Sequence, residues 1–193
     1  PFACAWNAAA FSGSSTSSRR GPRSAMTVLV AAASKHGATE EIATRIGADL
    51  VERGVPVEVK KLGEVDDIGR YDAFVVGSGI YLGTWLKEAR RFVDVHAAEL
   101  AKRSTWLFAS GSIVGAPPPV DDPDALRPGL ADKLVAKTGA HEHKLFGGKV
   151  DMRKLGLLEK AAVRGAHATE GDYRDWREID EWAAGIARQL EDR

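Results

Sequence analysis

The sequence predicts an α/β fold in which helices cover both faces of a five-stranded parallel sheet. Largely apolar runs at 28–33, 72–77 and 104–110 show no polar alternation, which is typical of strands buried on both faces. Stretches with apolar residues at helical spacing separate these runs. Strand–helix–strand units of this kind form right-handed crossovers, so the carboxyl ends of the strands meet at one edge of the sheet. That edge is where such sheets bind ligands.

Each part of the chain contributes to this alternation. Ile42, Ile46 and Leu50 recur at helical spacing after the first strand. Val57 and Val59 alternate with charged residues, which indicates a strand at or near the sheet edge. In chain order, the expected elements are a strand at 28–33, a helix ending at Gly54, a strand at 56–61, a connection at 62–71 with room for a short helix, a strand at 72–77, a helix at 86–100, a strand at 104–110, a helix at 123–137, a strand at 140–147, a connection at 148–173 and a helix at 176–190.

The later helices rest on the same periodicity. Ala89 and Phe92 lie on one face of the helix at 86–100, and Ile179 and Trp182 lie on one face of the closing helix. Pro128 and the glycine after it make the helix at 123–137 irregular.

The first 25 residues differ from the rest in composition. They are Ser-rich, lack periodicity and carry three arginines without an acidic residue. Such a segment buries too little apolar surface to fold, so we expect 1–25 to be a disordered leader or extension and 26–193 to be the domain. A transit peptide is the alternative for the first segment, because it is rich in Ser and Arg.

The composition excludes several classes of protein. The chain has 193 residues, 44% of them hydrophobic, which suits one domain with a full core. No apolar run approaches the ~20 residues of a membrane-spanning helix. Cys4 is the only cysteine, which excludes a disulfide framework or a cysteine-based metal site and favours a reducing cytoplasm. Without Arg19, Arg20 and Arg23, the 27 basic residues fall to 24 against 27 acidic ones, a net charge of −3 that gives no reason to expect nucleic acid as a partner.

The loop after the first strand has the composition of an anion site. Ser34 and Thr39 supply hydroxyls, and the N-terminus of the following helix presents backbone N–H groups. The spacing matches neither the P-loop of nucleotide triphosphatases nor the glycine motif of dinucleotide-binding folds. We therefore expect residues 34–39 to bind a phosphate. The alternative is an ordinary strand–helix turn in which Thr39 only caps the helix.

Two further loops, 78–85 and 110–116, are expected at the same edge of the sheet. Tyr81 and Trp85 offer aromatic faces for a flat ring, and the glycines around them let the backbone approach a ring edge. The alternative for at least one of the two aromatics is packing on the next helix. A ligand with a phosphate at one end and a ring at the other fits the three loops together.

These segments resemble the flavodoxin-domain family that includes menaquinone-dependent protoporphyrinogen IX dehydrogenase. The motifs that carry the resemblance are ASKHGAT at 33–39, GSGIYLGTW at 77–85, FASG at 108–111, FGGK at 146–149 and GDYRDW at 171–176. The resemblance implies a flavodoxin-like three-layer sandwich with strand order 2-1-3-4-5 and FMN as the cofactor. It further implies that the phosphate is held by Ser34, Lys35, His36, Gly37, Ala38 and Thr39, and the ring by Ser78, Gly79, Ile80, Tyr81, Leu82, Gly83, Trp85, Ser110, Gly111, Ser112, Ile113 and Gly115.

The resemblance and the charge together predict an FMN-dependent oxidoreductase. Flavodoxins that act as electron shuttles are usually strongly acidic, whereas residues 26–193 have a net charge of only −3. We expect two-electron transfer from a reduced substrate, with protoporphyrinogen as the candidate, to a quinone. No acid or base residue is identified, although His36 is the candidate nearest the expected site. The alternatives are an electron-transfer flavodoxin and a flavin-free interaction domain.

The connection at 148–173 contains a basic amphipathic pattern. Apolar residues recur at spacings of three and four between Met152 and Ala162, with lysines and arginines between them. Residues 152–164 would then contact a membrane surface, cover the flavin or pack on the domain. We expect a cytoplasmic protein, with a peripheral position at the inner face of a membrane as one alternative and a homodimer as one arrangement. His141 and His143 share one side of a strand but lack a recognised ligand spacing, so no metal is expected.

Overall fold

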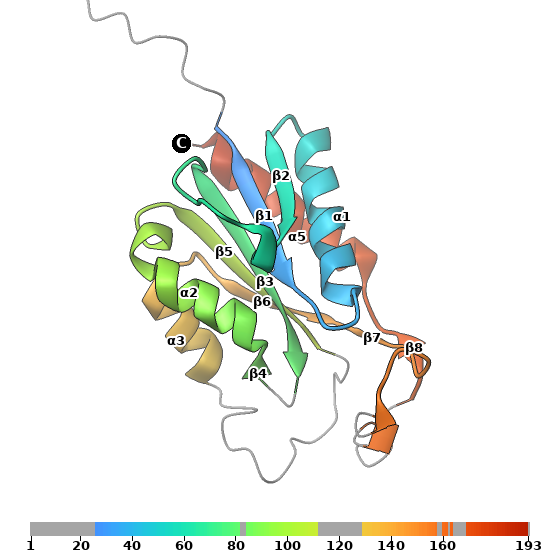
Figure 1. The fold of residues 1–193 in the computed structure, drawn as a ribbon. Coiled ribbons are helices and arrows are strands. Elements are labelled where there is room, and N and C mark those ends of the chain that lie inside the picture. The colour runs from blue at the N-terminus through green and yellow to red at the C-terminus, as the bar shows by residue number, and fades with distance from the viewer. Residues whose placement is uncertain are drawn as a thin grey trace, which may run out of the picture.

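The computed structural model describes residues 26–192 apart from 82–83, 112–128, 158–159, 162 and 164–168. In this part of the chain a parallel sheet lies between two layers of helices (Figure 1). The strands of the sheet are β1 (Val28–Ala33), β2 (Val57–Lys61), β3 (Ala73–Tyr81), β5 (Ser104–Gly111) and β6 (His143–Gly147). The helices are α1 (Ala38–Glu52), α2 (Lys87–Leu100), α3 (Gly129–Thr138) and α5 (Trp176–Glu191), with a short 3₁₀ helix η1 (Leu62–Glu64).

The strand order is β2-β1-β3-β5-β6, and each neighbouring pair is parallel. This is the order 2-1-3-4-5 expected for the five strands, so the flavodoxin-like fold class is confirmed. The order reverses between β1 and β3, which places the topological switch point between the carboxyl ends of these two strands.

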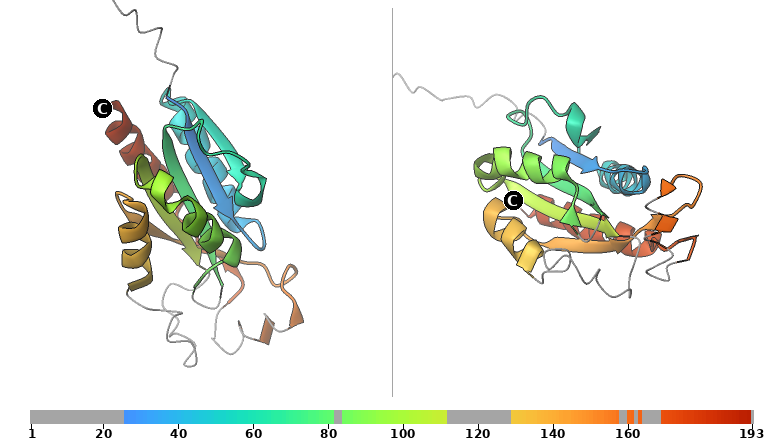
Figure 2. Two further views of the ribbon diagram at one scale, coloured as in Figure 1. Left: turned by 60° about the vertical axis from the view of Figure 1, so that its left-hand side comes forward. Right: turned by 60° about the horizontal axis from the view of Figure 1, so that its bottom comes forward.

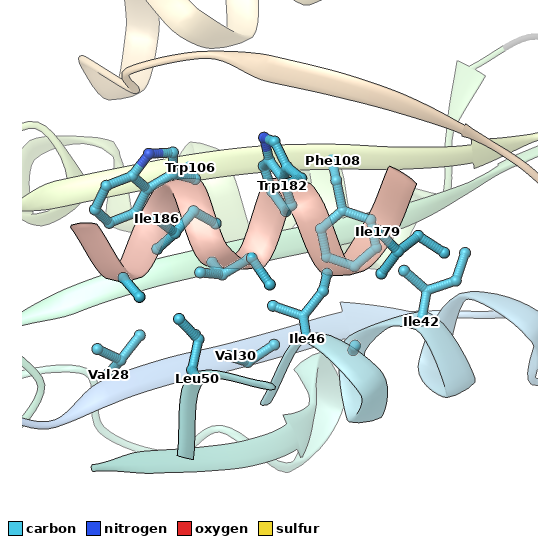
Figure 3. Packing of buried hydrophobic residues seen from close by; sticks show 14 of the residues in the cluster. Val28, Val30, Ile42, Ile46, Leu50, Trp106, Phe108, Ile179, Trp182 and Ile186 are labelled. Atoms are coloured by element: carbon cyan, nitrogen blue, oxygen red, sulfur yellow. The ribbon is translucent and has the colours of Figure 1, made fainter. Parts of the chain in front are cut away.

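Two apolar clusters hold the layers together, one on each face of the sheet. Helices α1 and α5 cover one face, and α2 and α3 cover the other (Figure 2). On the first face, Ile46 of α1 points toward Ile179 and Trp182 of α5, above Val30 of the sheet (Figure 3). Full burial of such a side chain stabilises the fold by roughly 1.5–3 kcal/mol. The helix faces predicted from periodicity are therefore the ones that pack.

Two expected strand boundaries are wrong, and the first lies next to the candidate site. Residues 78–81 were expected as loop but continue β3, because its pairing with β5 runs on to Gly79 opposite Ser110. The short strand β4 (Thr84–Trp85) then folds back antiparallel on β3. At the other sheet edge, β6 begins at His143 instead of Ala140, and Leu145 in its middle is 54% exposed.

The connection at 148–173 contains a second small sheet. Strands β7 (Lys149–Val150) and β8 (Gly171–Asp172) pair antiparallel. This ribbon lies beyond the carboxyl ends of the main strands, near the start of α1 (Figure 1). No helix in the described part of the chain is both long and apolar enough to cross a membrane. The segment 1–25 and the start of the helix expected at 123–137 lie outside the described residues.

Candidate functional site

The loop between β1 and α1 gathers backbone N–H groups around one hydroxyl. Ser34 Oγ accepts hydrogen bonds from the backbone N–H of Gly37 (2.9 Å) and of Thr39 (3.3 Å). Gly37 precedes α1 with φ +91°, a left-handed conformation that suits glycine. Gly37 is the N-cap residue of α1 and Thr39 lies buried inside its first turn, so Thr39 does not cap the helix. The loop thus combines amides, hydroxyls and a helix N-terminus, the donor set for a phosphate.

Two lysines flank this loop. Lys35 Nζ lies 3.9 Å from the centroid of the Tyr81 ring, over its face. This is a cation–π contact between β3 and the loop at 34–39, the candidate phosphate loop. Lys154, from the segment after β7, donates a hydrogen bond from Nζ to the His36 carbonyl (3.2 Å). His36, Lys149 and Lys154 line a small pocket beside the loop. Lys35, Lys149 and Lys154 therefore place positive charge beside this loop.

The carboxyl end of β3 brings the ring-side residues against the phosphate loop. A Cβ at Gly79 would lie only 3.1 Å from Thr39 Oγ1, so glycine allows the two segments their close approach. Ile80 and Tyr81 follow at the half-buried end of the strand. Ser78 is fully buried; its hydroxyl donates to the Gly79 carbonyl (2.9 Å) and accepts from the Leu86 N–H (3.0 Å). The Ser78 hydroxyl therefore makes its hydrogen bonds within the fold, where they connect β3 to the start of α2.

The two expected ring-stacking aromatics separate in the structure. Trp85 is 1% exposed and belongs to the core between the sheet and α2. Its Nε1–H donates to His143 Nε2 (3.2 Å), and burial lowers the pKa of His143. Trp85 therefore leaves no face for a ligand, contrary to its expected place in the ring site. Tyr81 is the aromatic that remains at the edge.

The third expected segment is only partly described. Ser110 is buried, and its hydroxyl donates to the Gly147 carbonyl at 3.4 Å. Gly111 ends β5 and pairs with Gly147. The other residues expected around the ring lie outside the described residues: Leu82, Gly83, Ser112, Ile113 and Gly115.

Residues 29–176 match the model of a family described as the flavodoxin domain. This match spans most of the chain. The chain belongs to the flavodoxin-domain family.

Solved structures agree with this flavodoxin-domain fold. A flavodoxin from the domain Archaea superimposes with a TM-score of 0.58 at 17% identity, over 86% of this chain and 99% of that one. Flavodoxin 2 from Bacillus cereus superimposes with a TM-score of 0.55 at 20% identity, over 86% of this chain and 99% of that one. The rubredoxin oxygen:oxidoreductase of Desulfovibrio gigas gives 0.55 at 12% identity over 86% of this chain and 36% of that one. No curated protein matches the chain in sequence.

Membership in the flavodoxin-domain family assigns FMN as the cofactor, and the described residues fit it. The amides and hydroxyls between Ser34 and Thr39 suit a phosphate. Gly79 and Tyr81 lie at the carboxyl end of β3, beside the switch point where such folds bind their ligands. Among the described residues, no three side chains of His, Cys, Asp or Glu gather as metal ligands.

The sequence reasoning missed one group of residues at this edge. The β7–β8 ribbon brings Lys149, Lys154 and Arg174 next to the phosphate loop and the start of α1. Arg174 stands in the GDYRDW motif, but nothing in that motif states which distant segment its side chain meets. The available signal was an arginine placed between two aspartates, Asp172 and Asp175, in that motif.

Proposed function

We propose that this flavodoxin-domain protein is an FMN-dependent oxidoreductase that takes two electrons from a reduced small molecule and passes them to a quinone. The observation that carries the proposal is the close approach of β3 to the phosphate loop, at Gly79 and Thr39. It supports one continuous site with a phosphate end at α1 and a ring end beside Tyr81. Bound FMN supplies the redox chemistry, while the chain binds and orients it.

The charge of the domain supports a small-molecule acceptor. Residues 26–193 carry a net charge of −3, from 24 basic and 27 acidic residues. Proteins that dock on oppositely charged redox partners gain association rate from a strong electrostatic field. A nearly neutral domain has little of this advantage, and an uncharged quinone does not require it.

Protoporphyrinogen is the electron donor that the sequence resemblance favours, and it is the first donor to test. Each cycle would remove two electrons and two protons from the donor and reduce one quinone to a quinol. Anaerobic mixtures of protein, FMN, porphyrinogen and a soluble naphthoquinone would be followed by porphyrin fluorescence. Porphyrin formation that requires both protein and quinone supports the proposal, and a rate equal to that without protein contradicts this choice of donor.

Flavin binding is the first experiment for the proposal as a whole. The purified protein is incubated with FMN, freed of excess ligand and examined by visible absorption. Ser34→Ala should weaken FMN binding, because it removes the hydroxyl on which the loop N–H groups converge. Thr44→Ala is the matched control, since the Thr44 hydroxyl lies within α1 and donates to the Glu40 carbonyl. Absence of bound flavin in the wild type would overturn the oxidoreductase proposal.

An electron shuttle is the second candidate, and the similarity in fold to flavodoxins favours it. Stepwise reduction of the FMN-loaded protein distinguishes the two. A one-electron-reduced flavin that accumulates during the titration supports the shuttle. Direct conversion to the two-electron-reduced form, with rapid reoxidation by a quinone, supports the oxidoreductase.

Contact with a membrane through 152–164 is a proposal about how a lipid-soluble quinone reaches the site. Leu157 is 87% exposed, and Arg153 and Lys154 are exposed close to it in the chain. Apolar and basic side chains together favour an anionic bilayer surface. The protein should sediment with anionic vesicles and remain in solution with neutral ones, and Leu157→Ser should reduce the sedimented fraction. Equal recovery with both vesicle types would contradict the proposal.

A further inference from the structure

Arg174 is a charged side chain enclosed by the fold. Its side chain is 3% exposed, and charged residues are almost never buried to this extent unless they are paired. Its guanidinium binds the Asp172 carboxylate with two hydrogen bonds, from Nε (2.7 Å) and Nη2 (2.5 Å). From Nη1 it donates to Glu41 (2.6 Å) and to the Ala38 carbonyl (3.4 Å). The guanidinium also lies 4.4 Å from the centroid of the Trp176 ring.

These contacts join the β7–β8 ribbon to the start of α1. Ala38 and Glu41 form the first turn of α1, directly behind the phosphate loop, and Asp172 belongs to β8. The segment that carries Arg174 is itself fixed on the end of β6. The Tyr173 N–H donates to the Gly148 carbonyl (2.9 Å), and a Cβ at Gly147 would overlap the Tyr173 carbonyl. Arg174 therefore connects a fixed strand end to the turn that positions the phosphate loop.

The charge of Glu41 gives this contact an electrostatic consequence. A carboxylate in the first turn of a helix is favourable for the helix dipole, but it repels a phosphate bound at the same helix N-terminus. The ion pair with Arg174 offsets part of the charge of Glu41, because the same guanidinium also pairs with Asp172. The same guanidinium lowers the pKa of Asp172, so this second carboxylate stays ionised and keeps Arg174 in place.

We propose that Arg174 is a positioning residue for the phosphate of FMN, because it holds the first turn of α1 and offsets the charge of Glu41. This inference rests on the proposed function, in which FMN occupies the site. The role needs the planar fork of arginine. A lysine offers a single ammonium group, which cannot reproduce the two-oxygen contact with Asp172 and reach Glu41 and Ala38 as well.

The phosphate dependence of binding tests the inference. Riboflavin carries the same ring as FMN without the phosphate, so the dissociation constants of both flavins are measured by fluorescence quenching. Arg174→Met should weaken FMN binding about tenfold and riboflavin binding less than about twofold. Arg174→Lys should lie between the wild type and Arg174→Met. Adding Glu41→Gln to Arg174→Met should restore part of the lost FMN affinity.

Arg53→Met is the matched control. Arg53 makes a similar side-chain pair with Asp49 at the opposite end of α1, and both FMN and riboflavin should bind this variant as they bind the wild type. Thermal unfolding of each variant identifies any loss of folding, and if Arg174→Met is unfolded, Arg174→Lys decides the question. Equal loss of affinity for both flavins, or unchanged FMN affinity in folded Arg174→Met, overturns the inference alone. A wild type that binds neither flavin overturns the proposed function, and this inference with it.

Discussion

At the scale of single residues, Gly79 determines how closely β3 approaches the candidate phosphate loop. A Cβ at this position would lie 3.1 Å from Thr39 Oγ1 and 3.8 Å from the Ala33 carbonyl oxygen. A methyl group here would crowd the buried Thr39 hydroxyl, which the proposed phosphate site includes. The effect of a substitution should therefore appear in flavin binding as well as in stability.

Gly79→Ala is expected to weaken FMN binding and to lower the free energy of unfolding by about 1–3 kcal/mol, the usual cost of overpacking. Flavin titration and urea unfolding measure the two effects. Gly129→Ala is the control, since a Cβ at Gly129 meets no atom within 4 Å. Unchanged FMN affinity in Gly79→Ala would show that the Thr39 hydroxyl does not need its observed position.

His143 gives the second prediction at this scale, a dependence of stability on pH. Its Nε2 accepts the Trp85 N–H, which requires a neutral ring, and burial lowers its pKa in the folded state. The unfolded chain, with a pKa of about 6.5, therefore binds the proton first as the pH falls. Stability from the neutral ring is complete above about pH 6.5 and is lost as the pH falls toward the lowered pKa of the folded state.

The wild type should lose more unfolding free energy than His143→Gln between about pH 7.5 and about pH 5, because glutamine can accept the Trp85 bond but does not titrate in this range. Urea unfolding at the two pH values measures the difference. His96→Gln on α2 is the control and should behave as the wild type. Equal losses in wild type and His143→Gln would mean that the Trp85 contact does not depend on the charge of His143.

At the scale of elements, burial decides which parts of the fold could be predicted from the sequence. The strands at β1, β3 and β5 and the inward faces of α1 and α5 follow from apolar spacing, because the core imposes that spacing. The end of β3 was missed since its glycines indicate a loop in isolation, whereas pairing with β5 keeps them in the sheet. The β7–β8 ribbon depends on the pairing of Lys149 with Asp172 across a long connection, and the contact of Arg174 with Glu41 joins residues 133 positions apart. No local pattern contains such contacts.

The packing of α5 on α1 should account for a large share of stability. Ile186 is buried in the cluster shown in Figure 3, where it faces the sheet together with Trp182. Ile186→Ala should lower the free energy of unfolding by about 2–5 kcal/mol, because the cavity it leaves adds to the lost burial. Arg177→Ala, an exposed position on the same helix, should change it by less than about 0.5 kcal/mol. Urea unfolding compares them, and similar losses in both would contradict a core role for this face.

At the scale of the whole molecule, the two sides of the fold have separate tasks. The α1–α5 side, through its buried apolar cluster, fixes the helix at whose N-terminus the proposed phosphate site lies. The α2–α3 side buries Trp85 and leaves Tyr81 at the carboxyl edge. The segment after β6 adds Lys149 and Lys154, together with Asp151, to that edge. The connection that holds β7 and β8 therefore contributes to the charge at the carboxyl edge of this flavodoxin-like sheet.

The small net charge leads to a prediction about ionic strength. Residues 26–193 have a net charge of −3, so their long-range attraction to a charged protein partner is weak. At 0.1 M, salt screens the remaining attraction beyond about 10 Å. Turnover of the FMN-loaded protein with a neutral quinone should change less than about twofold between about 0.01 M and 0.3 M salt. Initial rates of quinone reduction measure this. A basic electron-accepting protein is the comparison: fast transfer to it at low salt that falls steeply with salt would favour the electron shuttle, because only a steered protein encounter depends on screening in this way.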